Sequence, residues 1–221
     1  MKRQYLGDWK DSFKWEYHDY LLQQLHYEYF QIVWMMTPDY TKSHGGIGPD
    51  RFPARPEILR LCRELRANRK PEKLESLPGI TSASYKVISY RANEYLTYRN
   101  RNSYFSDIAA LPNQVLFLDP DNGFEPEGKC KARHIGYTEI DSILQKLPST
   151  SIISVFHHFR RKRFSEDFAR IRERLHSGFS TAIHWHFLMF VAVSPSEAMI
   201  DRARAINLDY AKSKSSVQVI E

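Results

Sequence analysis

The stretch QVLFLDPDNGFEPEG, residues 114–128, decides how the rest of the chain is interpreted. It begins with the short apolar run VLFL (115–118), which predicts a buried strand. The run ends directly in DPDNG (119–123), a combination typical of a turn, because Asp and Asn bond to nearby backbone and Gly accepts a positive φ. A buried strand thus delivers two carboxylates and an amide to one point, where they form either a site or only a turn.

Further strands and helices are predicted on both sides of this stretch. The apolar runs FQIVWMM (30–36), SIISVF (151–156) and TAIHWHFLMFVAV (181–193) are each expected to form one strand. Helices are expected from Asp8 or Ser12 to Tyr29, from Pro56 to Ala67, over 137–147, from Ser165 to Gly178, and from Pro195 to Lys212. Alternating strands and helices with near-continuous apolar strands predict an α/β fold, a three-layer Rossmann-like sandwich with a mostly parallel central sheet.

Length and composition favour one globular domain with a polyanionic partner. The chain has 221 residues, 42% of them hydrophobic, and a formal net charge of +6. We expect a single domain over 1–221, with the irregular segment 70–103 as a candidate small insertion. The basic charge favours nucleic acid, DNA first, as the partner. Two cysteines, the absence of an apolar signal core near Met1 and the absence of a membrane-length apolar run predict a cytoplasmic protein without a membrane partner.

Polar residues follow each predicted strand, at the end where ligands bind in open parallel sheets. If the strands are parallel, the following residues meet at one edge: Thr37, Asp39, Asp119, Asp121, Asn122, His157, His158 and Ser194. We expect a pocket there. Asp119, the last strand residue, is the stronger candidate to face it, since Asp121 suits a bond within the turn.

Each piece also has a purely structural interpretation. DPDNG is a good turn by itself, and the segment that begins at Ser194 is a good helix cap. At least one of His157 and His158 is expected to pack inward. The basic residues that we expect to hold a nucleic-acid backbone are Arg51, Arg99, Arg101, Arg160, Arg161, Lys162 and Arg163.

Two enzyme activities match part of this stretch, but the sequence lacks a feature that each of them requires. Asp121, Glu127 and Lys129 resemble the PD…ExK pattern of metal-dependent nucleases, but no second strand fits in the short interval between the acids. DPDN resembles the Asp-Pro-Pro-Tyr motif of adenine-N6 methyltransferases, and GDWKDSFKW (7–15) is similar to the opening of their ribosomal-RNA members. Asn122 replaces the aromatic residue of that motif, and no strand is followed by a tight glycine loop for S-adenosylmethionine.

A nucleobase glycosylase needs neither a cofactor nor a metal. It needs a carboxylate for the attacking water and the sugar cation, which Asp119 or Asp121 offers, and a group such as His157 or His158 to stabilise the departing base. Asn122 offers hydrogen bonds to a base edge. VLFLDPDNG resembles the first motif of uracil-DNA glycosylases, and VAVSPS (191–196) their later Ser-Pro loop, with Phe124 or Phe159 as the stacking ring.

The leading hypothesis is therefore a cofactor-independent DNA glycosylase that acts on a flipped base. A modified base, as in phage DNA, is one candidate substrate, and repair and antiviral defence are both compatible roles. The alternatives are an adenine-N6 methyltransferase-like protein, a metal-dependent nuclease and a non-catalytic nucleic-acid-binding module. The sequence leaves open the target base, DNA against RNA, and the oligomeric state.

Overall fold

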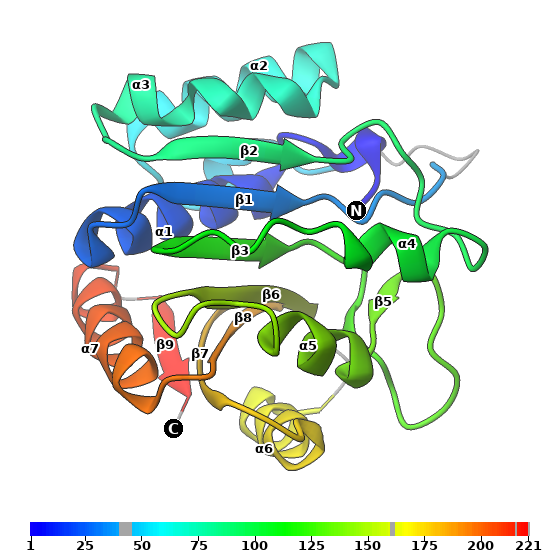
Figure 1. The fold of residues 1–221 in the computed structure, drawn as a ribbon. Helices are drawn as coiled ribbons and strands as arrows, with labels where there is room; N and C mark the ends of the chain where they lie inside the picture. Colours follow the sequence, from blue (N-terminus) through cyan, green and yellow to red (C-terminus); the bar gives the residue numbers. More distant parts are fainter. Residues whose placement is uncertain (40–45, 160–161, 215, 221) are drawn as a thin grey trace.

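The protein is described by a computed structural model that covers residues 1–39, 46–159, 162–214 and 216–220. The described residues form a seven-stranded sheet in the order β2–β1–β3–β6–β8–β7–β9 (Figure 1). Its strands are β1 (Tyr29–Val33), β2 (Lys86–Tyr90), β3 (Gln114–Leu118), β6 (Ile152–His158), β7 (Phe179–Trp185), β8 (Leu188–Ser194) and β9 (Val217–Ile220). A separate short pair, β4 (Gly123–Phe124) and β5 (His134–Ile135), follows β3.

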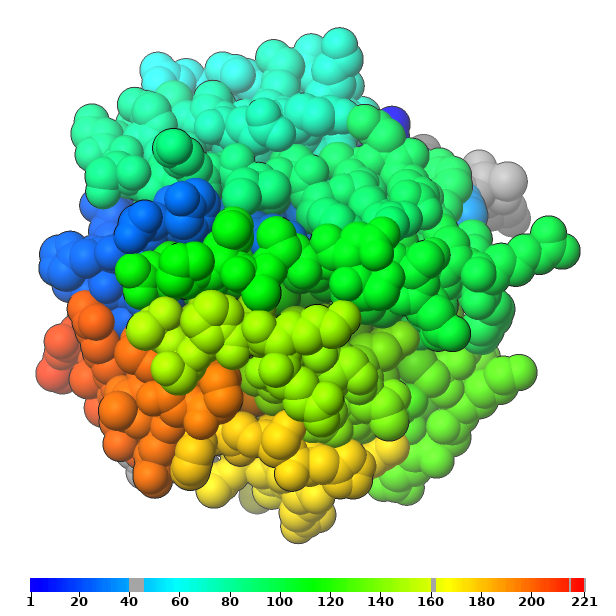
Figure 2. Space-filling model, viewed as in Figure 1, coloured from blue at the N-terminus to red at the C-terminus, as the bar shows by residue number. Residues whose placement is uncertain are grey.

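Helices cover both faces of the sheet, and this confirms the three-layer α/β prediction. One face packs against α1 (Trp9–Leu25), α2 (Pro56–Asn68), α3 (Leu77–Thr81) and α7 (Glu197–Ser213). The other packs against α4 (Arg101–Ser106), α5 (Tyr137–Leu144) and α6 (Phe164–Arg174). Short 3-10 turns lie at Arg3–Tyr5, Pro49–Arg51 and Pro71–Ser76. In the space-filling view, side chains close the gaps between these layers (Figure 2).

Alternation along the central strands divides the core in two. In β3, Val115 and Phe117 face α1, whereas Leu116 and Leu118 belong to the opposite apolar cluster. Successive strand residues point to opposite faces, so a strand with helices on both sides must be apolar throughout. All five residues of β3 are buried. The run VLFL therefore marks a central strand, as predicted.

The sheet is mixed, because the run 181–193 forms two strands and not one. β2, β1, β3 and β6 are parallel, whereas β8 pairs antiparallel with both β6 and β7. His186, with a φ of 50°, and Phe187 make the turn between β7 and β8. β8 therefore ends at the edge opposite to DPDNG, and the expected convergence fails for Ser194, whose hydroxyl donates to the Ser151 carbonyl at 2.9 Å.

Two strands of the seven-stranded sheet lie outside the predicted set, as does the short pair β4 and β5. β2 falls within 70–103, the candidate insertion, and pairs with β1 along its whole length. β9 follows α7 and pairs antiparallel with β7. Both lie at edges of the sheet, where a strand has one neighbour and a weaker apolar pattern.

Candidate functional site

DPDNG leaves the sheet at the carboxyl end of β3, beside the end of β1. The Asp119 N–H donates to the Val33 carbonyl at 3.0 Å, which continues the pairing of the two strands by one residue. Along the chain, β1 is followed first by β2, which pairs with one side of it, and then by β3, which pairs with its other side. The point between β1 and β3 is therefore a topological switch point. Such points are where open α/β sheets bind ligands. The chain's first residues lie at the same place (Figure 1).

Asp119 is held in a buried ion pair. Both of its carboxylate oxygens lie 2.9 Å from Nζ of Lys14, on α1, and the two side chains are 1% and 3% exposed. Lys14 also contacts Asp11 at 3.1 Å. Burial alone would lower the pKa of Lys14, but Asp119 and Asp11 outweigh it and raise that pKa. Burial raises the pKa of Asp119, and Lys14 opposes that shift. Asp119 thus joins α1 to β3.

Asp121 and Thr37 meet, as the sequence predicted. The Thr37 hydroxyl donates to Asp121, and the Met1 amino group and Lys2 Nζ lie 2.9 and 3.6 Å from its oxygens. Burial would raise the pKa of Asp121, but the Met1 amino group and the Thr37 hydrogen bond hold it below its ordinary value. The carboxyl group of Asp121 is therefore ionised at neutral pH. Its side chain is 14% exposed.

Asp39 does not join Asp121. It is exposed, and it accepts a hydrogen bond from the Gln4 N–H at 3.1 Å.

A small cavity separates the N-terminus of α1 from the end of β3. Its volume is about 30 Å³, and its lining includes Asp8, Asp119 and Asp121. This is room for about one water molecule. Asp8 caps α1 by accepting from the Lys10 N–H at 2.8 Å, and burial followed by the nearby Asp11 raises the pKa of Asp8 to about 6.

The His157 ring packs against Gly123, the last residue of DPDNG. The ring is fully buried, with Nε2 2.6 Å from Asp167, and Nδ1 accepts from the Phe124 N–H at 3.2 Å. These bonds place the proton on Nε2. Gly123 has a φ of 91°, and a Cβ there would lie 2.3 Å from Nδ1, so only glycine fits. Phe124 is buried against Tyr137, and the structure thus places both His157 and Phe124 inside the core.

Asn122 and His158 border a basic pocket of about 440 Å³. Its remaining lining is Pro126, Lys129, Lys131, Arg133, His134 and Phe159. The Asn122 side-chain oxygen accepts from Arg133 Nε at 3.1 Å in the orientation that satisfies its hydrogen bonds. Burial, then Lys10, lowers the pKa of His158. No described carboxylate lines the pocket or forms an ion pair with Lys129, Lys131 or Arg133.

Lys131 and Arg133 were not among the predicted site residues, and Lys129 was named only for the nuclease alternative. They lie in the loop that joins β4 to β5. The signal was present in the sequence as KCKAR (129–133), three cations within five residues.

The predicted nucleic-acid contacts are spread over several places. Arg160 and Arg161 lie outside the described residues, whereas Lys162, Arg163 and Arg99 are exposed. The Arg51 guanidinium lies 4.8 Å from the Trp9 ring centre.

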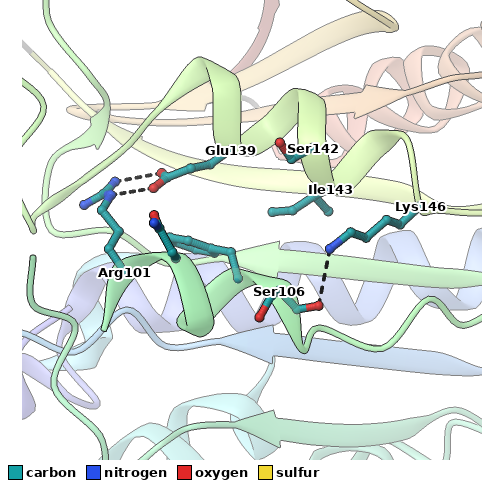
Figure 3. A pocket seen from close by; sticks show the side chains of 8 residues that line it. Arg101, Ser106, Glu139, Ser142, Ile143 and Lys146 are labelled. Carbon is teal, nitrogen blue, oxygen red and sulfur yellow. Dashed lines mark hydrogen bonds and ion pairs between the residues drawn. The ribbon is translucent and has the colours of Figure 1, made fainter. Parts of the chain in front are cut away.

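Arg101 has a structural role. It forms an ion pair with Glu139, and both side chains line a cavity of about 240 Å³ between α4 and α5 (Figure 3). It also donates to the His134 carbonyl at 2.7 Å.

Other features bear on the alternative functions. Glu127 and Lys129 lie in the loop between β4 and β5, outside any described strand. Within the described ranges, no group of three or more His, Cys, Asp or Glu side chains is arranged to hold a metal ion. None of the described helices is long and apolar enough to cross a membrane. No protein-family model and no curated protein matches the chain.

Proposed function

We propose that this protein acts on nucleic acid and binds it at the basic pocket beside DPDNG. The observation that carries the proposal is the lining: Lys129, Lys131 and Arg133 point three cations at one concavity that no described carboxylate lines. Phosphate groups are the natural partners of such a set, and the net charge of +6 favours approach of a polyanion over the whole molecule.

Hydrolysis of a base–sugar bond is the reaction we propose for this site. Of the two predicted carboxylates, Asp121 is the better candidate, because Lys14 holds both oxygens of the fully buried Asp119. The pKa of Asp121 is below its ordinary value, its side chain is 14% exposed, and the next residue, Asn122, lines the basic pocket. In the proposed step, Asp121 orients water, whose oxygen bonds to the sugar carbon as the bond from that carbon to the base nitrogen breaks. The bond electrons leave with the base, which takes up the proton that water loses by way of Asp121. Asn122 and His158 would contact that base.

The test incubates the purified protein, without added cofactor, with DNAs that carry normal and modified bases. Abasic sites are then revealed as strand breaks after hot alkali. We expect EDTA-resistant breaks with the wild type and with Asp39→Asn, an exposed carboxylate that serves as the matched control. Asp121→Asn should abolish the breaks and keep DNA binding. Breaks that persist in Asp121→Asn, or no breaks with any base, would overturn the glycosylase proposal.

The adenine-N6 methyltransferase-like alternative has one observation in its favour. β8 lies antiparallel between β6 and β7, next to the parallel strands β2, β1, β3 and β6. This resembles the strand arrangement of that family's fold, and the argument is an analogy at the level of the fold. The residues present do not fit S-adenosylmethionine, since the cavity between α1 and β3 measures about 30 Å³. Transfer of a labelled methyl group from S-adenosylmethionine to DNA would nevertheless favour this alternative.

A further inference from the structure

Two exposed aromatic rings stand beside the basic pocket. Phe159 follows β6, and Phe187 lies in the turn between β7 and β8; they are 36% and 46% exposed. Their ring centres are 5.7 Å apart, and the Phe159 N–H donates to the Phe187 carbonyl at 2.9 Å. The backbone bond holds the two residues side by side, and their rings, tilted by 54° to each other, form an exposed apolar platform at the pocket that Phe159 lines.

A third exposed ring adjoins the pocket through a different lining residue. Tyr98 is 60% exposed, and Lys129 Nζ lies 5.8 Å from its ring centre. The Tyr98 hydroxyl donates to the Cys130 carbonyl at 3.4 Å, which ties the ring to the loop that carries the pocket's cations. Exposed aromatic rings therefore contact two of the residues that line the pocket: Phe187 contacts Phe159, and Tyr98 contacts Lys129.

This combination of groups matches one kind of ligand. Unpaired nucleic acid offers phosphates to cations and open base faces to aromatic rings, whereas a duplex keeps its base faces stacked. We propose that an aromatic–basic strip binds single-stranded nucleic acid or an unpaired segment within a duplex. The strip consists of Tyr98, Lys129, Lys131, Arg133, Phe159 and Phe187.

The proposal rests on the proposed function and adds the state of the nucleic acid to it. Lys129, Lys131 and Arg133 hold the backbone, and the Phe159–Phe187 platform stacks on a base. Stacking is tolerant of sequence because every base has a π-face, so the strip selects unpaired strands over paired ones with little base preference. An unpaired base at this place also lies beside Asn122, which lines the same pocket.

The experiment measures binding by fluorescence anisotropy, with a labelled single strand and a duplex of the same sequence, over a range of salt concentrations. The paired variant Phe159→Leu/Phe187→Leu removes the platform. Phe179→Leu is the matched control, because Phe179 is 43% exposed at the opposite end of β7. Lys131→Gln tests the cations, with Lys86→Gln at the amino end of β2 as its control.

We expect the wild type to bind the single strand more tightly than the duplex. Phe159→Leu/Phe187→Leu should weaken single-strand binding by about 5- to 150-fold, the range for loss of one stacked base, and should leave duplex binding unchanged. Phe179→Leu should bind both forms as the wild type does. Lys131→Gln should weaken binding to both forms and reduce the salt slope by about 0.7 for the single strand. Circular dichroism establishes that each variant is folded, and single Leu variants replace the pair if it is not.

The outcomes separate the two proposals. If the wild type binds neither form in a salt-sensitive way, the proposed function fails. If it binds both forms equally and the Leu variants change nothing, nucleic-acid binding stands and the single-strand inference is overturned.

Discussion

Replacing Lys14 by methionine tests the buried ion pair that fixes DPDNG to α1. Methionine keeps the length and apolar body of the side chain but removes its charge. Asp119, 1% exposed, would lose the cation that lies 2.9 Å from both of its oxygens. Asp11 would lose its 3.1 Å contact with Lys14 but keep the hydrogen bond that it accepts from the Gly7 N–H at 2.7 Å. The main consequence is thus one uncompensated buried carboxylate.

The expected cost is large because the pair is desolvated. Removing one partner of a buried ion pair costs about 3–5 kcal/mol of unfolding free energy. With a urea m-value of about 3 kcal/mol/M, the unfolding midpoint should fall by about 1–1.7 M. In Lys14→Met/Asp119→Asn the side chain at position 119 is neutral, so one buried charge fewer lacks its cation and we expect the double variant to be more stable than Lys14→Met alone.

Urea unfolding followed by circular dichroism measures these differences, with Lys10→Met on the same helix as the control and an expected change below about 1 kcal/mol. The deficit of Lys14→Met should narrow as the pH falls from 7 to 5. Burial raises the pKa of Asp119, and in Lys14→Met no Lys14 opposes that shift, so the folded variant takes up the proton at a higher pH than the wild type and gains stability relative to it. A loss below about 1 kcal/mol, or a double variant less stable than Lys14→Met, would refute the reasoning.

The packing beneath DPDNG gives further predictions. Gly123→Ala should cost at least about 2 kcal/mol in thermal unfolding, because the φ is 91° and the new Cβ would lie 2.3 Å from His157; near-wild-type stability would contradict this. His157 and Arg170 lower the pKa of Asp167 to about 2 against the effect of burial, so its stabilisation is complete above pH 4 and lost as the pH falls towards 2. Asp167→Asn should therefore unfold with a flatter acid profile and lack about 2 kcal/mol at pH 7. Burial lowers the pKa of His18 to about 3, so its NMR signal should not titrate between pH 8 and 5, and stability should fall as the pH drops below 6.5 because the unfolded chain takes the proton. A His18 midpoint near 6.5 would show that the ring is not held neutral.

Several local signals were interpreted correctly, although the helices predicted to end at Tyr29 and Gly178 end at Leu25 and Arg174. Asp8 caps α1, Pro56 is the first residue of α2, and VLFL falls within β3. The β7–β8 turn was missed because His186-Phe187 carries none of the Gly or Asn signals of a two-residue hairpin, although His186 takes a positive φ. β2 was missed because it is a half-buried edge strand, defined by its pairing with β1 far away in the sequence.

The location of the site could be predicted from the sequence, but the ion-pair partner of Asp119 could not. That the ends of β1, β3 and β6 share one edge follows from a parallel arrangement, and Thr37 meets Asp121 as expected. The partner of Asp119 is Lys14, 105 residues earlier, and no spacing rule connects them. The sequence can show that a carboxylate ends a buried strand. It cannot show which cation a folded helix brings to it.

The pairing changes what the two carboxylates of DPDNG do for the molecule. Left unpaired, Asp119 and Asp121 would repel a phosphate backbone from the edge where the basic pocket opens. Lys14 lies 2.9 Å from both oxygens of Asp119, and Lys2 lies 3.6 Å from Asp121, so these cations offset part of the negative charge at this edge. Asn122, the first uncharged polar residue after them, is the one that lines the pocket. The Lys14–Asp119 pair therefore fixes the position of the segment, Asn122 lines the pocket, and the cations of the β4–β5 loop give that pocket its positive charge.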